Sequence, residues 1–156
     1  MQDSNHVKKG NKYKNTQIHY NDFNFKSKQE LNCYKTFKEA GFELQYEKFP
    51  ISLMSSFKPL VNVYLPSKSK DLVLTKKSFI GITYHVDFYL PLERNGRKIH
   101  VFIEVKGMPN DVYPLKKKMF IKALEEQFED PENIYFFEVH NIRQVHQAIN
   151  IINSIV

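Results

Sequence analysis

Apolar residues recur at every third position between residues 28 and 40, which is the spacing of an amphipathic helix. The positions concerned are Leu31, Tyr34, Phe37 and Ala40. Ser27 is followed three residues later by Glu30, and this pair forms a capping box at the start of the predicted helix. Gly41 supplies the left-handed residue that commonly ends a helix.

Two further helices are predicted in the C-terminal half of the chain. Pro114 suits the first turn of a helix that continues to about Glu129. Its inward-facing residues are expected to be Leu115, Met119, Ala123 and Leu124. Asn141 is a favourable N-cap for the last helix, whose apolar stripe consists of Val145, Ala148, Ile149, Ile152 and Val156.

Strands are predicted where β-branched and aromatic residues gather or alternate with polar ones. Residues 80–90 and 99–106 are two such runs, and the Asn95-Gly96 pair between them is a strong signal for a tight hairpin. Residues 42–49 also alternate, and we expect the proline at position 50 to end that strand.

The remaining segments predict shorter strands. Residues 133–139 form an apolar run that fits a short buried strand. Between residues 51 and 78, prolines and a Lys-Ser run leave room only for short strands near residues 61–65 and 72–75. The order of elements is therefore α-β-β-β-α-β-α, which predicts an α/β fold of the α+β type, a mixed sheet flanked by helices.

The 156 residues are enough for one domain, which we place at residues 25–156. Residues 1–24 are mostly polar and show no period, so we expect a flexible basic N-terminal arm there. Its lysines either reach a phosphate backbone or are simply solvated; they are Lys8, Lys9, Lys12 and Lys14.

Composition excludes several classes of protein. A hydrophobic content of 42% excludes disorder of the whole chain, and no apolar run approaches the roughly 20 residues of a membrane span. The single cysteine, Cys33, excludes a disulfide framework and a cysteine-based zinc cluster. The polar N-terminus lacks the core of a signal peptide, so we expect a cytoplasmic protein.

The net charge of +6 favours polyanionic partners, although many small basic proteins never bind nucleic acid. Lys116, Lys117 and Lys118 add to this signal, because they occupy the first turn of a predicted helix, where the helix dipole disfavours cations. Either a phosphate backbone or screening by water offsets that cost. Lys116 and Lys118 are the residues expected to contact phosphate.

Pairing the predicted hairpin about Asn95-Gly96 sets Arg94 opposite Arg97. In this register Asp87 opposes Glu104, and His85 opposes Lys106. Strand alternation then places these four polar residues on one face. The other face is expected to be core; it contains Val86, Phe88, Leu90, Val101, Ile103 and Val105.

Two carboxylates directly across a ladder repel each other unless a cation lies between them. Oxygen ligands without a cysteine or paired histidines favour Mg²⁺ or Mn²⁺ over zinc. The alternative is a solvent-facing strand on which Asp87, Glu104 and Lys106 form salt bridges. A bulge at Pro91 would also shift the register and move Asp87 to the other face.

Glu30 has two interpretations. It is the reciprocal half of the capping box. It also lies on the helical side that packs on the sheet, with Tyr34 and Phe37, where its carboxylate would be held over a metal ion.

Asp87, the Glu104-Val105-Lys106 triplet and a preceding helix that carries Glu30 resemble the PD-(D/E)XK nuclease superfamily. The segments at residues 25–30, 84–88, 103–107 and 115–120 are similar to small phage-encoded nucleases related to Holliday-junction resolvases. The resemblance covers roughly residues 25–139 and implies a restriction-endonuclease-like αβββαβ core, here with an added C-terminal helix. The proline that usually precedes the aspartate is Val86 in this chain.

The resemblance also implies roles for individual residues. Asp87, Glu104 and the carbonyl of Val105 would be metal ligands, Glu30 would bind a metal ion or its water, and Lys106 would position or activate the attacking water. From its place opposite Lys106, His85 is expected to contact the substrate, and Lys28 is expected to join Lys116 and Lys118 in contacting nucleic acid.

The expected function is therefore Mg²⁺- or Mn²⁺-dependent hydrolysis of DNA phosphodiester bonds by an endonuclease. Branched DNA is one expected substrate, in which case a homodimer would make the two coordinated cuts. A nuclease subunit of a transposon or restriction system is an alternative. A nucleic-acid-binding module that keeps the fold without catalysis is another.

Overall fold

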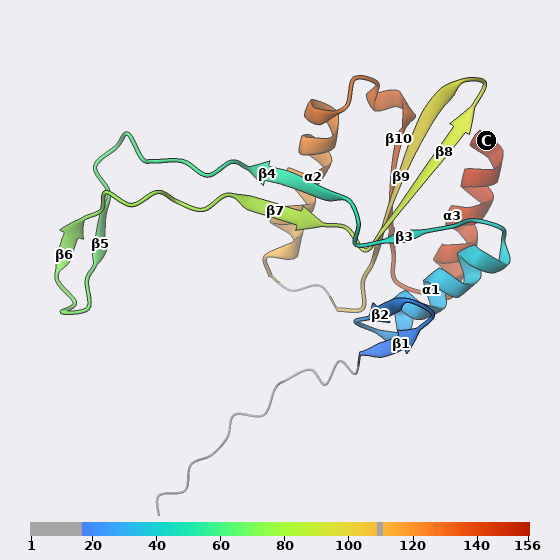
Figure 1. The fold of residues 1–156 in the computed structure, drawn as a ribbon, viewed down its shortest axis with the longest axis horizontal. Helices are drawn as coiled ribbons and strands as arrows, with labels where there is room; N and C mark the ends of the chain where they lie inside the picture. The colour runs from blue at the N-terminus through green and yellow to red at the C-terminus, as the bar shows by residue number, and fades with distance from the viewer. Residues whose placement is uncertain (1–16, 109–110) are drawn as a thin grey trace, which may run out of the picture.

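The computed structural model describes residues 17–108 and 111–156, and at its centre is a four-stranded mixed sheet in the order β10-β9-β8-β3 (Figure 1). β8 (Phe88–Arg94) is antiparallel to both β3 (Gln45–Tyr46) and β9 (Arg97–Val105). β10 (Ile134–Val139) runs parallel to β9, so the chain needs a crossover between them, which α2 (Tyr113–Gln127) supplies. The predicted mixed sheet with helices is confirmed.

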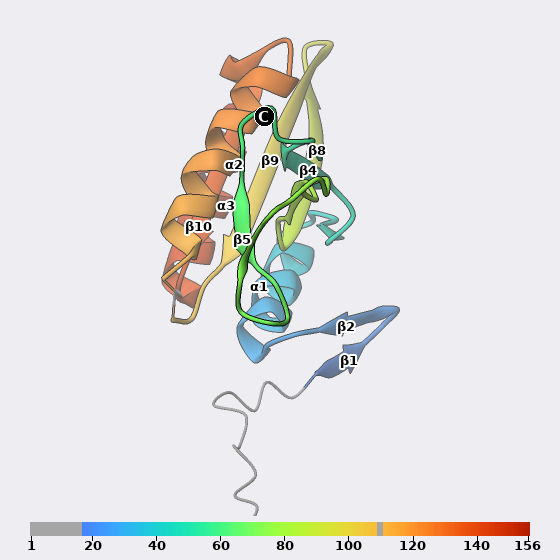
Figure 2. The ribbon, with the colours of Figure 1, turned by 90° about the vertical axis from the view of Figure 1, so that its left-hand side faces the viewer.

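Helices cover both faces of the sheet. α1 (Lys28–Glu39) and α3 (Ile142–Ile155) pack on one face, and α2 packs on the other, as Figure 1 shows from the side and Figure 2 with α2 toward the viewer. The first face buries Phe88 and Ile103, while the second buries Tyr89 and Phe102. The sheet therefore has two apolar cores, and β9 is buried from position 101 to position 104 on both of its sides.

The start and end of α1 agree with the prediction. The Ser27 hydroxyl accepts a hydrogen bond from the Glu30 N–H at 3.1 Å. At the other end Gly41 has a φ of 87°, and the N–H of Phe42 donates to the carbonyl of Phe37 at 2.9 Å, which is the Schellman pattern. Ala40, the last of the regularly spaced apolar residues, is exposed because the helix ends at Glu39.

The hairpin has the predicted register. Arg94 pairs with Arg97, and Asn95 and Gly96 both have positive φ, 52° and 76°, as a type I′ turn requires. Pro91 pairs with His100 without a register shift, so the bulge considered for Pro91 is absent from this described strand pair.

The strand predicted over residues 42–49 is mostly wrong. Only Gln45 and Tyr46 pair with β8, and Glu47 adopts a φ of 49° that interrupts the strand. Pro50 begins β4 (Pro50–Met54) instead of ending a strand, which a proline can do because the first residue of a strand need not donate.

The single strand predicted over residues 80–90 is divided in two. β7 (Ile82–His85) pairs with β4, and the chain bends at residues 86 and 87 before β8 begins. This bend moves Val86 into the core beneath α2, whereas Phe88 lies in the opposite core, so the prediction that both share a face is wrong.

β4 and β7 form a two-stranded ribbon that extends away from the sheet (Figure 1). Farther along it, β5 (Tyr64–Pro66) and β6 (Leu72–Leu74) pair in antiparallel fashion. These are the two short strands expected in that segment. We call residues 55–81 the ribbon extension.

Part of the predicted N-terminal arm is folded. β1 (Ile18–Tyr20) and β2 (Phe23–Phe25) form a hairpin, because Phe25 is fully buried against the aromatic rings of Tyr34, Tyr46 and Phe88. A three-residue strand is too short to give a sequence period, which explains the error. The lysines at positions 8, 9, 12 and 14 lie outside the described residues.

The two C-terminal helices begin close to their predicted positions, and a short 3₁₀ turn (Pro131–Asn133) precedes β10. α2 buries Tyr113, Phe120, Ala123 and Leu124, so the predicted burial of Leu115, which is 61% exposed, is wrong. The stripe of α3 is buried as predicted except for its last residue, Val156. None of the three helices in the described ranges has the length and apolar character needed to cross a membrane.

Candidate active site

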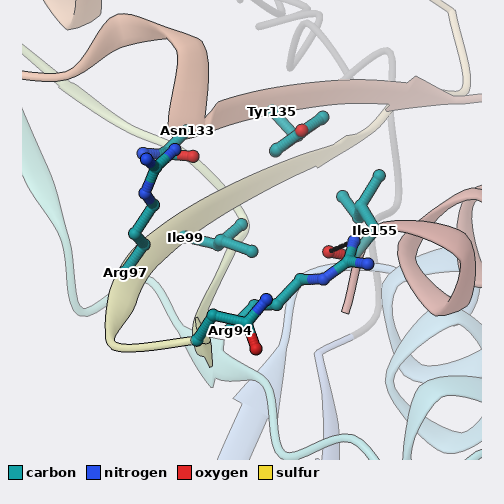
Figure 3. A pocket seen from close by; sticks show the side chains of 7 residues that line it. Arg94, Arg97, Ile99, Asn133, Tyr135 and Ile155 are labelled. Atoms are coloured by element: carbon teal, nitrogen blue, oxygen red, sulfur yellow. Dashed lines mark hydrogen bonds between the residues drawn. The ribbon is translucent and has the colours of Figure 1, made fainter.

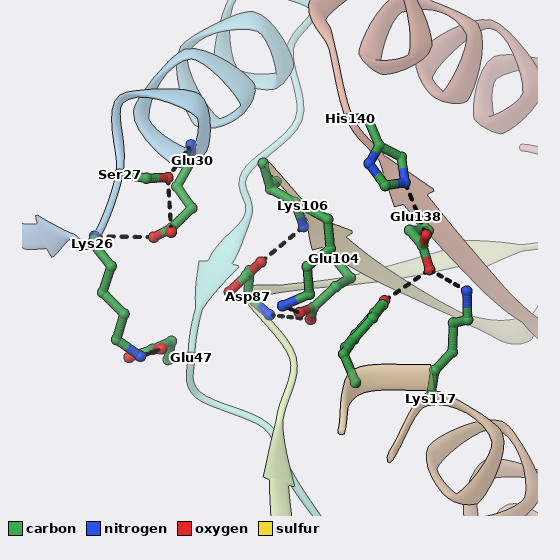
Figure 4. Close-up of polar contacts among 12 residues, drawn as sticks. Lys26, Ser27, Glu30, Glu47, Asp87, Glu104, Lys106, Lys117, Glu138 and His140 are labelled. Atoms are coloured by element: carbon green, nitrogen blue, oxygen red, sulfur yellow. Dashed lines mark hydrogen bonds and ion pairs between the residues drawn. The ribbon is translucent and has the colours of Figure 1, made fainter. Parts of the chain in front are cut away.

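Asp87 and Glu104 lie together where β9 leaves the apolar region beneath α2 (Figure 4). Asp87 occupies the bend before β8, and its Oδ2 accepts a hydrogen bond from the Val105 N–H at 2.8 Å. The N–H of Asp87 points to Glu104 Oε2 at 3.4 Å. The predicted hairpin register therefore brings the two carboxylate residues side by side.

Lys106 follows β9 on the same side as Glu104, two residues farther along. Its Nζ lies 2.5 Å from Glu104 Oε1, and it also lies 4.4 Å from the centre of the Tyr113 ring. Glu104 is only 2% exposed, whereas the Lys106 side chain is 26% exposed. The Lys106 side chain thus contacts the buried Glu104 and is also partly exposed at the molecular surface, where a substrate group can reach it.

The surroundings of Asp87 and Glu104 disfavour a negative charge on both carboxylates at once. Burial and the neighbouring charge of Glu104 raise the pKa of Asp87 well above its usual value, although the Val105 N–H opposes this shift. Burial and the adjacent Glu104, with which it forms a hydrogen bond, also raise the pKa of the Tyr84 hydroxyl. A cation near the two carboxylates would relieve their repulsion.

Glu30 is held by other partners. Its Oε2 accepts hydrogen bonds from the Tyr46 hydroxyl at 2.8 Å and from the Lys26 N–H at 3.0 Å, and its Oε1 accepts one from Ser27 Oγ at 2.9 Å (Figure 4). Among the described residues, no three Asp, Glu, His or Cys side chains gather closely enough to form a metal cluster. The expected convergence of three carboxylates on one point is therefore replaced by a pair, with Glu30 anchoring the start of α1.

The residues expected to contact nucleic acid, Lys28, His85, Lys116 and Lys118, are all exposed. Lys28 begins α1, and Lys116 and Lys118 lie on the outer side of α2. The expected pairing of His85 with Lys106 is wrong, because β7 leaves the sheet and His85 pairs with Pro50 of β4.

Sequence reasoning missed a second polar group beside the first. Glu138 Oε2 accepts hydrogen bonds from the Tyr113 hydroxyl at 2.8 Å and from Lys117 Nζ at 2.7 Å, and His140 Nε2 lies 2.8 Å from Glu138 Oε1 (Figure 4). Burial alone would raise the pKa of Glu138, but the hydrogen bonds from Lys117, Tyr113 and His140 lower it to about 2. We call these four residues the Glu138 group.

The two polar groups occupy matching positions on neighbouring strands. Glu138 of β10 pairs directly with Glu104 of β9, and each follows a buried or half-buried phenylalanine two residues earlier in its strand, Phe136 and Phe102. The sequence therefore contained a signal for this second polar group, the repeated Phe-x-Glu pattern. The pattern places Glu138 beside Glu104 only once β10 is known to be parallel to β9.

A cavity of about 470 Å³ lies at the far end of the sheet, beside the hairpin turn (Figure 3). Its lining includes Arg94, Arg97, Asn133 and Tyr135, and Arg94 donates to the Ile155 carbonyl at 2.7 Å. No carboxylate, histidine or lysine side chain lines this cavity, so it lacks a general base. The carboxylate pair at the opposite end of β9 is the better candidate for chemistry.

A model of a protein family matches residues 10–136, and its description is "Protein of unknown function (DUF1064)". No curated protein and no solved structure matches the chain.

Proposed function

Because the chain belongs to the DUF1064 family, whose description gives no function, we propose its activity from the site itself: divalent-metal-dependent hydrolysis of DNA phosphodiester bonds. The observation that carries the proposal is the buried pair of Asp87 and Glu104 with the Lys106 amine beside it. These three are among the residues that carry the resemblance to PD-(D/E)XK nucleases, and their proximity supports the proposal, whereas Glu30, which also carries the resemblance, is hydrogen-bonded to Tyr46 and Lys26.

The residues fit Mg²⁺ or Mn²⁺. Mg²⁺ is commonly held by one or two protein carboxylates together with substrate phosphate oxygens, so a third carboxylate is not required. Asp87 and Glu104 supply two, and the carbonyl of Val105 is expected to be a further oxygen ligand. When bound, the ion would supply positive charge that stabilises the negative charge on the attacked phosphate.

Lys106 and its neighbours have roles of their own. The Lys106 amine is anchored by Glu104 on one side and by the Tyr113 ring on the other, so it is held at a fixed position beside the carboxylates. From there it would orient the attacking water or contact the phosphate as a point charge. The Tyr113 ring is itself oriented by its hydrogen bond to Glu138.

A cleavage assay tests this proposal. We expect Asp87→Ala and Lys106→Ala each to lower the rate of plasmid nicking in Mg²⁺ or Mn²⁺ by roughly a hundredfold or more, with DNA binding largely kept. Glu93→Ala and Lys98→Ala are matched controls, because both residues are exposed at the other end of the hairpin. Full activity in either site variant would contradict the mechanism.

A calorimetric titration with Mg²⁺ tests the metal site separately. We expect heat of binding for the wild type and none for Asp87→Ala. Metal-independent DNA binding without any cleavage product would favour the alternative, a binding module that lacks catalysis. The ion pair between Glu104 and Lys106 is the observation that favours this alternative, since it neutralises one carboxylate without a metal ion.

The substrate can be narrowed by comparing four-way and linear DNA. Preferential cleavage of the four-way junction would support a resolvase-like enzyme, which needs a homodimer to make two cuts. Equal cleavage of linear duplexes would favour a nuclease subunit of a transposon or restriction system.

A further inference from the structure

The ribbon extension exposes an unusual amount of apolar surface. None of its residues is buried, and nine of its large apolar side chains are exposed by between 42% and 102%. They are Phe57, Leu60, Val61, Tyr64, Leu65, Leu72, Val73, Leu74 and Ile80. An isolated two-stranded ribbon is marginally stable in water, so this surface is expected to be covered by a partner.

The positive charge of the molecule is concentrated on the same segment. The ribbon extension contains five lysines and one acidic residue, a net charge of +4, whereas residues 17–54 and 82–156 contain 14 Lys and Arg against 15 Asp and Glu, a net charge of −1. The five lysines are Lys58, Lys68, Lys70, Lys76 and Lys77. In the described part of the chain none of them forms an ion pair.

The ribbon connects this charged segment directly to the candidate active site. β7 leads back from the extension and ends at His85, two residues before Asp87 (Figure 1). β4 runs beside it and is fixed to the body, by which we mean the central sheet and its helices, since Gln127 of α2 donates to the Ser52 carbonyl at 2.7 Å. A polymer seated over the carboxylates can therefore continue along the ribbon.

Two kinds of partner could cover this apolar surface, a second copy of the extension or a nucleic acid, and the charge of the extension distinguishes between them. Two copies of the extension would bring a charge of +4 against another +4, and the rest of the molecule carries too little negative charge to compensate. A nucleic acid supplies phosphates for the lysines, with release of counterions, and sugar and base surfaces for the apolar side chains. A two-stranded ribbon also fits the major groove of a duplex.

We propose that the ribbon extension is the principal DNA-binding element of this protein and that it tracks duplex DNA leading to the carboxylate pair. The choice of DNA rests on the proposed nuclease function. DNA binding does not require catalysis, so it can be measured under conditions in which no DNA is cleaved.

The test uses the full-length protein with a fluorescent 30-base-pair duplex in EDTA, with affinity measured by anisotropy over a series of salt concentrations. We expect the double variant Lys68→Gln/Lys70→Gln to bind several-fold more weakly than the wild type at low salt. We also expect the slope of log K against log salt to fall by about two, one for each lost phosphate contact. The matched control is Lys98→Gln/Arg143→Gln, which removes two exposed charges from the body and should leave both quantities unchanged.

Three results would overturn the proposal: no binding by the wild type, equal losses in the two double variants, or no loss in either. A dimer in DNA-free solution that dissociates in Leu72→Ser/Leu74→Ser would assign the surface to a second copy and also overturn it. Binding that depends on the ribbon extension, without any cleavage, would count against the proposed nuclease function alone. The two proposals can therefore fail separately.

Discussion

Glu138 shows how a single residue can link electrostatics to stability. Its pKa of about 2 lies below the ordinary value of 4.5, because three hydrogen bonds favour the carboxylate over the acid. A depressed pKa in the folded state means that the stabilisation is complete above about pH 4.5 and is lost as the pH falls toward 2.

We therefore expect Glu138→Gln to destabilise the protein by about 2 kcal/mol at pH 6, less than the full pKa shift implies because the side chain is partly exposed. Urea denaturation at several pH values measures this difference, which should shrink steadily below pH 4.5. Glu93→Gln, which changes an exposed carboxylate on β8, is the matched control for the substitution itself. A difference that stays constant down to pH 2.5 would contradict the assignment.

The candidate site was predictable where it depends on one local hairpin. The Asn95-Gly96 turn fixes the register, and that register alone places Asp87 beside Glu104 and Lys106 two residues farther along. Glu30 was expected to join them, but its carboxylate accepts hydrogen bonds from the Tyr46 hydroxyl and the Lys26 N–H and, among the described residues, forms no three-membered cluster with them. These two partners come from segments whose positions depend on long-range packing, which the residue pattern does not contain.

At the scale of elements, Gly81 controls how closely the two strands of the ribbon approach at the start of the extension. A Cβ placed on Gly81 would lie 2.6 Å from the Met54 carbonyl oxygen and 2.9 Å from the Ser56 nitrogen. Both are backbone atoms, so the strands would have to separate.

We expect Gly81→Ala to weaken the protection of β4 and β7 amides against hydrogen exchange while leaving β8 to β10 unchanged. Gly107→Ala is a suitable control for the substitution, because its nearest neighbour is the end of the flexible Gln29 side chain at 3.1 Å. Unchanged exchange in β4 and β7 of Gly81→Ala would show that the ribbon tolerates the extra methyl group.

The helix caps and the Asn95-Gly96 hairpin were predicted correctly, whereas the strands over residues 42–49 and 80–90, whose extent depends on distant partners, were not. The caps at Ser27 and Asn141 lie at the starts of α1 and α3 as expected. The break before Asp87 was missed because β7 follows β4 out of the sheet, and β4 begins at a proline that reads locally as a strand end. The pairing of β4 with β7, whose paired residues lie 28 to 35 positions apart in the sequence, determines where this break falls.

At the scale of the whole molecule, the ribbon extension shares no buried core with the rest of the described chain. The two cores contain residues of α1, α2, α3 and the central sheet together with β4, and no residue of the extension is buried. Phe57 and Phe79 stand opposite each other at its base, joined by a β-bridge.

Replacing residues 58–78 with a two-residue Asn-Gly turn should therefore leave the melting temperature within about 3 °C of the wild type. Differential scanning calorimetry of the shortened protein measures this. A loss of more than 10 °C, or failure to fold, would show that the extension contributes to the core.

The shortness of β3 has a consequence for association. It pairs only with Phe88 and Tyr89, so the outer edge of β8 beyond them has no neighbouring strand in the described sheet. An open edge of this kind invites strands from other molecules, yet Pro91 offers no N–H there and Glu93 and Arg94 place charges along it. These residues disfavour edge-to-edge aggregation along this part of β8, whereas β10 forms the opposite edge of the described sheet.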